Sequence, residues 1–275
     1  MSLTRGAAWR QAEERIDRLD ARLLVQHVCG CRHAELIAYP ERLLSPAEAE
    51  LFGSLVARRA GGEPLAYILG SAGFHGREFA VNSAVLIPRP ETEVLVELAL
   101  ERLRGLTAPA VLDLGTGSGI VAVTLALECP DARVTAVDLS PEALEVASGN
   151  ASSLCARVDF RAGSWFGPVA GECYDLVVSN PPYVVHGDPH LELNGLPYEP
   201  QMALTDGIPE GDGLACIRAI VAGAPTHLVP GGWLLFEHGY DQGAASRNLL
   251  QAAGFKNVLT QTDLAGIDRV SGGQI

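Results

Sequence analysis

The chain has 275 residues, of which 48% are hydrophobic and 19% are charged, and its formal net charge is −13. These values predict a folded α/β domain with a smaller second domain, and they exclude a disordered chain. The acidic balance argues against a protein that grips a nucleic-acid backbone, because that task needs clustered Lys and Arg. We therefore expect a protein or small-molecule partner and no direct contact with nucleic acid.

The N-terminus has no apolar stretch typical of a signal peptide, and no apolar run is long enough to span a membrane. A cytoplasmic protein without membrane contact is expected. Six cysteines are scattered without a C-x-x-C pair, and His186, His190 and Glu192 lie in a loop rather than on one helix face. These residues give no reason to expect a metal site.

Residues 1–70 are predicted to form a small helical domain. A first helix is indicated by apolar residues at intervals of three and four, namely Ile16, Leu19, Leu23, Leu24 and Val28. A second helix is expected to begin after Ser45, because Ser45 and Glu48 match a capping box and Pro46 occupies the first helical position. Its buried stripe is predicted to consist of Ala47, Leu51, Leu55 and Val56.

Residues 71–90 contain glycine, proline and short extended pieces, which predict a hairpin linker, and residues 91–275 alternate strand and helix. Near-continuous apolar strands are typical of a parallel sheet that helices cover on both faces. The expected fold of this part is therefore α/β and Rossmann-like. Its candidate strands are Ala110 to Leu114, Val134 to Asp138, Val158 to Arg161, Asp175 to Ser179 and Trp233 to Glu237.

A glycine-rich loop follows the first of these strands and leads into a helix that begins near Ile120. Glycines allow a tight turn and a close approach of the backbone to a ligand, and the start of the helix offers unpaired N–H groups. The loop therefore predicts a nucleotide-type pocket. The residues expected to bind the cofactor here are Gly115, Thr116, Gly117, Ser118 and Gly119.

Two acidic residues accompany the loop. Asp138 ends the next strand, where it is expected to accept hydrogen bonds from a pair of ribose hydroxyls. NAD enzymes keep an acid at the same place, but their glycine spacing is G-x-G-x-x-G, whereas this chain has G-x-G-x-G. Asp113 precedes the loop, where a carboxylate would repel a pyrophosphate and attract a cationic amino group. A cofactor that is a sulfonium amino acid fits better than a dinucleotide.

The tetrapeptide Asn180-Pro181-Pro182-Tyr183 follows an apolar strand and so falls where open α/β sheets bind ligands. An amide nitrogen is a poor nucleophile because its lone pair is delocalised. If the Asn180 side-chain oxygen and the Pro181 carbonyl each accept one N–H, they hold an NH₂ group in place and favour its pyramidalisation. Tyr183 can stack on a planar amide or base and exclude water.

The sequence resembles the HemK/PrmC family of protein-(glutamine-N5) methyltransferases, and the likeness covers nearly the whole chain. It is carried by the glycine loop, the tetrapeptide and four further segments, which are Glu63 to Gly70, Leu86 to Glu93, Glu237 to Gly243 and Asp268 to Val270. The resemblance implies a class I methyltransferase domain with a mostly parallel seven-stranded sheet, a small N-terminal helical domain, and S-adenosyl-L-methionine as cofactor. It also implies that Trp165 lies at the adenine, although ordinary core packing of this residue is an alternative.

The same resemblance implies that the substrate is the glutamine in the Gly-Gly-Gln loop of class I peptide chain release factors. Asn180, Pro181, Pro182 and Tyr183 would bind this glutamine, and the N-terminal helices would help to dock the release factor. Asn180, Pro181 and Tyr183 are the expected catalytic residues, and Asn180 is also expected to contact the cofactor. Two positions depart from the family pattern: Ser164 replaces a frequent acidic residue, and His238 replaces a small or aliphatic one.

Two other functions remain open from the sequence. An adenine-N6 methyltransferase would use the same clamp on a flipped base, although acidity argues against it. A non-catalytic partner of release factors that binds S-adenosylmethionine is the second. The C-terminus also spells Gly272-Gly273-Gln274, and a flexible tail of this kind could enter the clamp as a weak competing substrate, although a chance match is the favoured interpretation.

Overall fold

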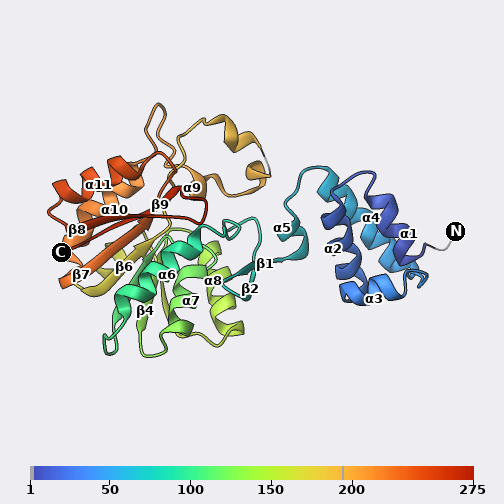
Figure 1. The fold of residues 1–275 in the computed structure, drawn as a ribbon, viewed down its shortest axis with the longest axis horizontal. Coiled ribbons are helices and arrows are strands. Elements are labelled where there is room, and N and C mark those ends of the chain that lie inside the picture. Colours follow the sequence, from blue (N-terminus) through green and yellow to red (C-terminus); the bar gives the residue numbers. More distant parts are fainter. Residues whose placement is uncertain (1–2, 194) are drawn as a thin grey trace. The chain divides into compact units, whose positions relative to one another are not determined.

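The N-terminal helices pack around a small apolar core of their own. The computed structural model describes residues 3–193 and 195–275. Leu24, Val25, Leu36, Phe52 and Leu55 are among the buried residues that these helices share. The helices are α1 (Arg5–Ala12), α2 (Arg18–Cys29), α3 (His33–Ala38), α4 (Pro46–Ala60) and α5 (Leu65–Leu69) (Figure 1).

The predicted start of α4 is confirmed, and its predicted buried face is partly wrong. The Ser45 hydroxyl accepts a hydrogen bond from the Glu48 N–H, and the Glu48 carboxylate accepts one from the Ser45 N–H. Leu55 and Val56 are buried as expected, but Ala47 and Leu51 are exposed and Phe52 is buried instead. The predicted and the observed buried faces of α4 differ by a shift of one residue. The observed face contains Phe52, whose aromatic side chain removes more apolar area from water than Leu51 would. In α2, Leu19 is likewise exposed against expectation, while Leu24 and Val25 are buried.

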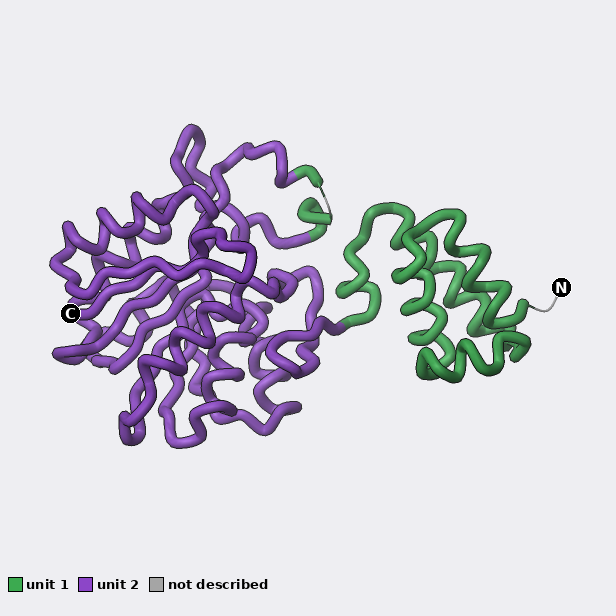
Figure 2. The backbone as a smooth tube through the Cα atoms, in the orientation of Figure 1, with its two compact units in different colours: residues 1–70, 192–198 green, residues 71–191, 199–275 purple. Residues whose placement is uncertain are grey.

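The chain divides into two compact units (Figure 2). The first contains residues 1–70 together with 192–198, and the second contains residues 71–191 and 199–275. Within the first unit, the Tyr198 hydroxyl donates a hydrogen bond to the Gly61 carbonyl (2.8 Å). No pattern in the sequence indicated that a segment from the second half of the chain joins the N-terminal helices.

The second unit contains a seven-stranded, mostly parallel sheet, as expected. Its strand order is β5-β4-β3-β6-β7-β9-β8, with β9 antiparallel to both of its neighbours. A separate antiparallel hairpin is formed by β1 (Ser71–Phe74) and β2 (Arg77–Ala80). The two C-terminal strands were not among the predicted ones. The sheet consists of β3 (Ala110–Leu114), β4 (Arg133–Asp138), β5 (Val158–Ala162), β6 (Tyr174–Ser179), β7 (Leu228–Glu237), β8 (Lys256–Thr262) and β9 (Asp268–Gln274).

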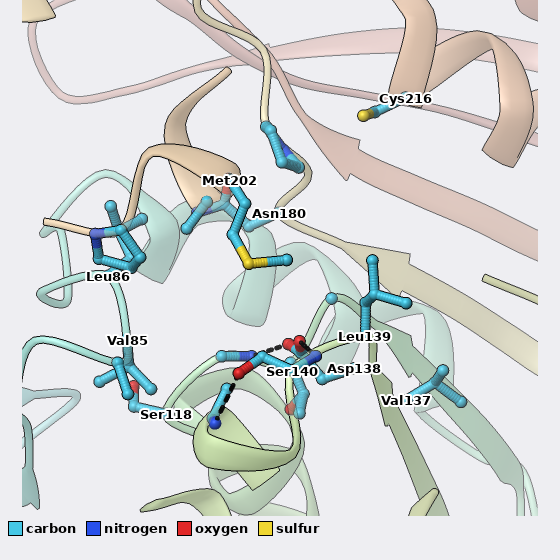
Figure 3. Close-up of a pocket in the computed structure, with 18 of the residues that line it drawn as sticks. Val85, Leu86, Ser118, Val137, Asp138, Leu139, Ser140, Asn180, Met202 and Cys216 are labelled. Carbon is cyan, nitrogen blue, oxygen red and sulfur yellow. Dashed lines mark hydrogen bonds between the residues drawn. The ribbon is translucent and has the colours of Figure 1, made fainter. Parts of the chain in front are cut away.

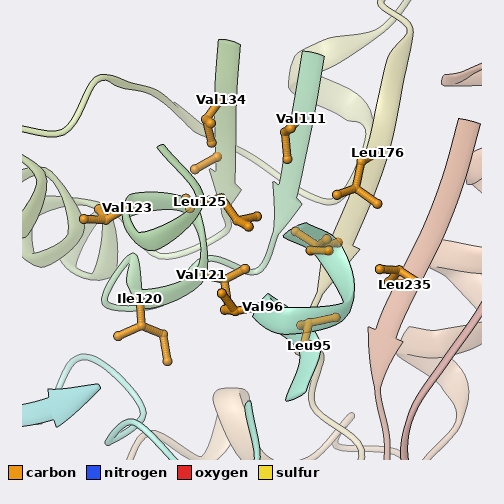
Figure 4. Packing of buried hydrophobic residues seen from close by; sticks show 14 of the residues in the cluster. Leu95, Val96, Val111, Ile120, Val121, Val123, Leu125, Val134, Leu176 and Leu235 are labelled. Atoms are coloured by element: carbon orange, nitrogen blue, oxygen red, sulfur yellow. The ribbon is translucent and has the colours of Figure 1, made fainter. Parts of the chain in front are cut away.

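Helices bury both faces of the sheet, which explains why its central strands β3, β4 and β6 are mostly apolar. Successive residues of β3 point to opposite faces: Val111 packs with α6 and α7, whereas Leu112 packs in a second cluster with α10. Figure 4 shows part of the first cluster, where side chains of the sheet such as Val111 and Leu176 meet those of α6 and α7. The covering helices are α6 (Thr92–Leu103), α7 (Ile120–Glu128), α8 (Pro141–Ser153), α10 (Ala215–Gly223) and α11 (Gly243–Ala252).

The C-terminal Gly-Gly-Gln is a sheet strand, so the hypothesis of a flexible tail is wrong. Gln274 pairs with Trp233 of β7 and with Lys256 of β8. Its side-chain amide donates to the Gly231 carbonyl and accepts from the Asn257 side chain, both at 2.8 Å. Gly272 has a packing role, because a Cβ atom there would lie 2.5 Å from the Leu234 carbonyl oxygen and would also clash with the Leu235 side chain.

We predict that Gly272→Ala lowers the free energy of unfolding by about 1–3 kcal/mol, because the added methyl group overpacks the interface of β9 with β7. Urea denaturation with an unchanged m-value would measure this loss. The control is Gly149→Ala, in the exposed interior of α8 with open space around the new Cβ, which should gain about 0.5–1 kcal/mol. Equal stability of Gly272→Ala and the parent would contradict the packing argument.

Candidate active site

Three parallel strands place the predicted site residues at one edge of the sheet. The glycine loop follows β3, Asp138 ends β4, and Asn180 follows β6. Because β4 and β6 flank β3 in parallel register, their carboxyl ends open onto the same crevice, where the strand order reverses. A cavity of about 630 Å³ lies there (Figure 3). The predicted residues that line it are Asp113, Gly115, Thr116, Gly117, Ser118, Asp138, Trp165, Asn180 and Pro182.

Gly119 is the predicted loop residue that does not line the cavity. It caps α7 with a φ of 82°, and a Cβ atom there would lie 3.1 Å from the Ala147 Cβ of α8. Its lack of a side chain therefore serves the close packing of two helices. Gly115 and Gly117 also have positive φ angles of 72° and 55°, in the left-handed region that glycine enters without strain.

Asp138 holds the loop in this shape as well as facing the cavity. One carboxylate oxygen accepts the Gly117 N–H at 2.8 Å, and the other accepts the Ser140 N–H at 2.9 Å. A carboxylate has about four lone-pair positions, so two bonds leave room for hydroxyl groups of a ligand. The predicted role of Asp138 at a ribose is compatible with this geometry.

Asp113 is a buried carboxyl group at the floor of the cavity. One of its oxygens accepts hydrogen bonds from the Thr116 hydroxyl (2.7 Å) and from the Ala122 N–H (3.2 Å). Burial and, to a smaller extent, the nearby Asp138 charge raise its pKa to about 7, against the opposing effect of these two donors. A cation in the cavity would favour the ionised form, so this group suits a ligand that carries an ammonium group.

The position of Trp165 is compatible with a contact to the adenine and also with core packing. It lines the cavity beside Gly115 and also packs at the edge of the second apolar cluster. Its φ of 43° is unusual for a bulky residue, and such strain tends to persist where neighbouring structure requires a particular side-chain direction. Ser164, one of the two departures from the family pattern, lines the same cavity.

Several lining residues were not predicted from the sequence. Leu139 is 59% exposed and follows Asp138, which in retrospect is a signal for an apolar wall. Met202 gave no signal, because it comes from a distant segment with no recognisable pattern. In Figure 3, Met202 and Asn180 lie across the cavity from Ser118 and Asp138.

The segment that carries Met202 is tied down by Glu199. The Glu199 side chain is 2% exposed and accepts hydrogen bonds from Arg89 Nη2 (2.6 Å) and from the Ile87 N–H (3.0 Å). This charge-assisted pair joins residues 84–89 to residues 199–207, and both segments contribute walls of the cavity. The sequence phrase around Arg89 thus has a structural role at the site.

Asn150 connects the hairpin to the glycine loop. Its side-chain amide donates to the Ala80 carbonyl (3.0 Å) and the Ser118 carbonyl (2.9 Å), and its oxygen accepts the Ala80 N–H (2.7 Å). The side chain is buried in α8 and satisfies backbone groups that no strand pairs. Sequence reasoning missed this residue, since an Asn in a helix carries no local mark of such a role.

The Asn180-Pro181-Pro182-Tyr183 segment separates two cavities. Asn180 and Pro182 line the larger one, while Asn180, Pro181 and Tyr183 line an adjacent cavity of about 50 Å³. The Asn180 Nδ2 atom donates to the Thr92 hydroxyl at 3.1 Å, so its Oδ1 atom is the group left to accept a hydrogen bond. The arrangement places an amide acceptor between a nucleotide-sized cavity and a small one.

Tyr183 is held from two directions. Its hydroxyl donates to Glu237 Oε1 (3.0 Å), and its carbonyl accepts from Gln242 Nε2 (3.0 Å). Burial and the Glu237 charge both raise the pKa of the phenol above its usual value. Tyr183 is therefore a neutral phenol at ordinary pH, which suits it to packing and not to proton abstraction.

His238, the second departure from the family pattern, has a structural explanation. It is fully buried, and burial lowers its pKa, so the ring is neutral. Nδ1 lies 2.8 Å from the Gly239 carbonyl and must donate, which leaves Nε2 to accept from the Ser271 hydroxyl at 2.9 Å. Thr260 lies 2.8 Å from Ser271. The chain of hydrogen bonds joins β7, β8 and β9 behind the loop that holds Tyr183.

The sheet topology and the residues that line the cavity together define a protein class. A seven-stranded sheet of this order, with a glycine loop after its central strand and an acid at the end of the next, is that of a class I S-adenosylmethionine-dependent methyltransferase. The donor set fits this cofactor, since Asp113 suits the ammonium group and Asp138 suits the ribose. The fold is shared with a 16S rRNA methyltransferase of T. thermophilus in complex with AdoMet and guanosine (TM-score 0.54, 22% identity, covering 74% of this chain and 49% of that one). A methyltransferase from Pyrococcus furiosus is also similar (TM-score 0.53, 16% identity, 79% and 96% covered).

Sequence comparison identifies the family. Residues 7–70 match the model of the PrmC N-terminal domain, and residues 91–194 match that of the methyltransferase small domain. A release factor glutamine methyltransferase of Bordetella pertussis is 51% identical over 96% of this chain and 97% of its own length. That of Vibrio cholerae is 45% identical over 100% and 98%. The chain belongs to the release factor glutamine methyltransferase family. Within the described residues, no helix is long and apolar enough to cross a bilayer.

The raised pKa of Asp113 predicts that cofactor affinity depends on pH. Below about 7 the carboxyl group is protonated and loses its attraction for the ammonium group, so affinity should rise with pH and level off above this value, by up to about tenfold per unit. Calorimetry between pH 5.5 and 7.5, at ~0.1 M salt, would measure this.

Asp113→Asn should bind more weakly and flatten the profile. Methylthioadenosine, which lacks the amino-acid part of the cofactor, serves as the control ligand, and its affinity should not vary through this group. A profile for S-adenosylmethionine that is equally steep in Asp113→Asn would show that another group is responsible.

Proposed function

We propose that this protein transfers the methyl group of S-adenosylmethionine to the side-chain amide nitrogen of the glutamine in the Gly-Gly-Gln loop of peptide chain release factors. The observation that carries the proposal is the position of Asn180, whose amide lies between the two cavities and is anchored through its nitrogen by Thr92. An anchored nitrogen leaves the oxygen to accept an N–H of the substrate.

The residues of the segment divide the work of activating a poor nucleophile. Bound S-adenosylmethionine supplies an electrophilic methyl group on a sulfonium. Asn180 Oδ1 and the Pro181 carbonyl each accept one N–H of the glutamine amide, which orients the nitrogen and favours its pyramidal form. The neutral Tyr183 excludes water. The amide proton leaves after methylation, when the nitrogen is cationic and acidic.

The size of the smaller cavity favours an amide over adenine. Its volume of about 50 Å³ has room for a few water-sized groups, which suits the small carboxamide group better than the two fused rings of adenine. The net charge of −13 also opposes a long contact with phosphates. Incubating the enzyme with labelled S-adenosylmethionine and either release factor or DNA tests this choice: label should appear on the release-factor glutamine, and label on DNA alone would overturn the proposal.

Docking of the release factor is assigned to the N-terminal unit. Each residue that lines the two cavities lies in the second unit, so residues 1–70 are available for a role other than chemistry. Residues 37–43 expose Ile37, Tyr39 and Leu43, apolar side chains of the kind that partners cover. The class I release factors are the partners that we propose for this unit.

Asn180→Ala should lower kcat by on the order of 10²-fold, because the acceptor amide loses its orienting group. The affinity for S-adenosylmethionine should stay nearly unchanged by calorimetry. Asn248→Ala, an exposed position on α11, is the matched control and should behave as the parent. A parallel loss of cofactor affinity in Asn180→Ala would assign this residue to the cofactor and not to the acceptor.

Removal of residues 1–70 should raise the KM for release factor and leave the affinity for S-adenosylmethionine nearly unchanged. The deletion also removes the Gly61 carbonyl that the Tyr198 hydroxyl contacts. Tyr198→Phe in the full-length chain is therefore the control for the loss of that contact. An unchanged KM in the truncated enzyme, or an equal rise in Tyr198→Phe, would show that docking does not depend on residues 1–70 as such.

A further inference from the structure

A buried carboxyl group lies behind the substrate clamp and has no part in the reaction described above. Glu237 ends β7, is 1% exposed, and accepts a hydrogen bond from the Tyr183 hydroxyl at 3.0 Å. Thr92, at the start of α6, is fully buried, and its hydroxyl acts on this carboxyl group as a donor that lowers its pKa. The same Thr92 hydroxyl accepts the hydrogen bond from Asn180 Nδ2. Three elements thus meet in one polar chain inside the core.

The chemistry of these groups determines the direction of each hydrogen bond. An ionised carboxylate only accepts, so the hydroxyls of Thr92 and Tyr183 must both direct their protons toward Glu237. The oxygen of Thr92 then presents its lone pairs to Asn180, where only the NH₂ end of the amide can donate. Consequently the nitrogen of Asn180 turns to Thr92 and its oxygen to the substrate. An Asn amide without this neighbour can rotate by half a turn and present the wrong end.

We propose that Glu237 is a positioning residue that orients the Asn180 amide through Thr92 and the Tyr183 ring by direct contact. The inference rests on the role proposed for Asn180 in the transfer. Glu237 does not touch substrate or cofactor in this scheme. Its negative charge makes one orientation of the Asn180 amide more stable than the flipped one. Packing alone cannot do this, because the oxygen and the NH₂ group of the amide have nearly the same shape.

The surroundings of Glu237 make this orienting effect sensitive to pH. Burial raises the pKa of the Glu237 carboxyl, and one of its oxygens, Oε2, has no hydrogen-bond partner among the described residues. Thr92, Tyr183 and the positive charge of Arg269 lower the pKa, and the negative charge of Glu91 raises it. Protonation would let the Glu237 carboxyl group donate a hydrogen bond. The Thr92 hydroxyl would then no longer be held in the orientation that binds the Asn180 nitrogen.

The first test compares matched variants of buried threonines. Thr92→Val keeps the shape and removes the hydroxyl, and it should lower kcat at least about tenfold with little change in cofactor affinity. Thr92→Ser should restore most of the activity. Thr124→Val is the control, because Thr124 is fully buried in α7 and its hydroxyl has no partner among the described residues. Equal kcat values for Thr92→Val and Thr124→Val would overturn the proposal.

The second test is a double-mutant cycle. If Thr92 acts through Asn180, adding Thr92→Val to Asn180→Ala should lower kcat by less than about twofold more, because the amide to be oriented is already gone. Full additivity of the two losses would overturn the inference. The pH profile of kcat should also fall on its acid side in the parent enzyme, and Glu237→Gln should have a low kcat that no longer varies there.

A third measurement does not depend on the substrate. In protein labelled with ¹⁵N at asparagine, the side-chain NH₂ signals of Asn180, assigned with Asn180→Ala, should titrate with Glu237 in the parent and lose this dependence in Thr92→Val. If these signals do not titrate in the parent enzyme, the proposed positioning role of Glu237 is wrong. If the Asn180 signals titrate in the parent enzyme but the enzyme does not methylate release factor, the proposed function is wrong and the positioning role of Glu237 is retained.

Discussion

Parallel pairing of β3, β4 and β6 is the constraint on which the rest of the molecule depends. Backbone hydrogen bonds align these strands, so the segments that leave their carboxyl ends converge although they are far apart in sequence. The glycine loop, Asp138 and Asn180 meet for this reason alone. Apolar side chains on both faces of the sheet keep the strands in register, and the large buried area makes that register costly to change.

Polar groups in the core are arranged so that each carboxyl group has a distinct environment. Asp138 is at the surface of the cavity and orders the glycine loop by accepting backbone N–H groups. Asp113 and Glu237 are buried, and desolvation raises the pKa of each. Desolvation has a different consequence at each group. Asp113 faces a cavity that suits a cation, while Glu237 faces hydroxyl groups that it orients.

The His238 network shows how the fold supports these groups from behind. A neutral histidine joins the end of β7 to the middle of β9, and the loop after it brings Gln242 to the Tyr183 carbonyl. On the other side of the site, Glu199 binds Arg89 and closes the wall that carries Met202. Both supports use buried polar side chains whose partners are complete, which favours one arrangement over many.

The sequence by itself determined the elements whose signals are local. Apolar runs located the five parallel strands, the Ser45 box located a helix start, and the glycine loop with Asp138 and Asn180 indicated a methyltransferase. It did not reveal β8 and β9, because β9 is rich in glycine and polar residues. Only glycine fits at positions 272 and 273, since Leu235 and Phe255 approach Gly272 and Gly273 closely, and this approach is visible only in the tertiary structure. Nor did the sequence reveal Thr92, Glu199, Asn150 or Glu237. A buried polar residue acquires its role from a partner supplied by another element, and only the tertiary structure decides which partner that is.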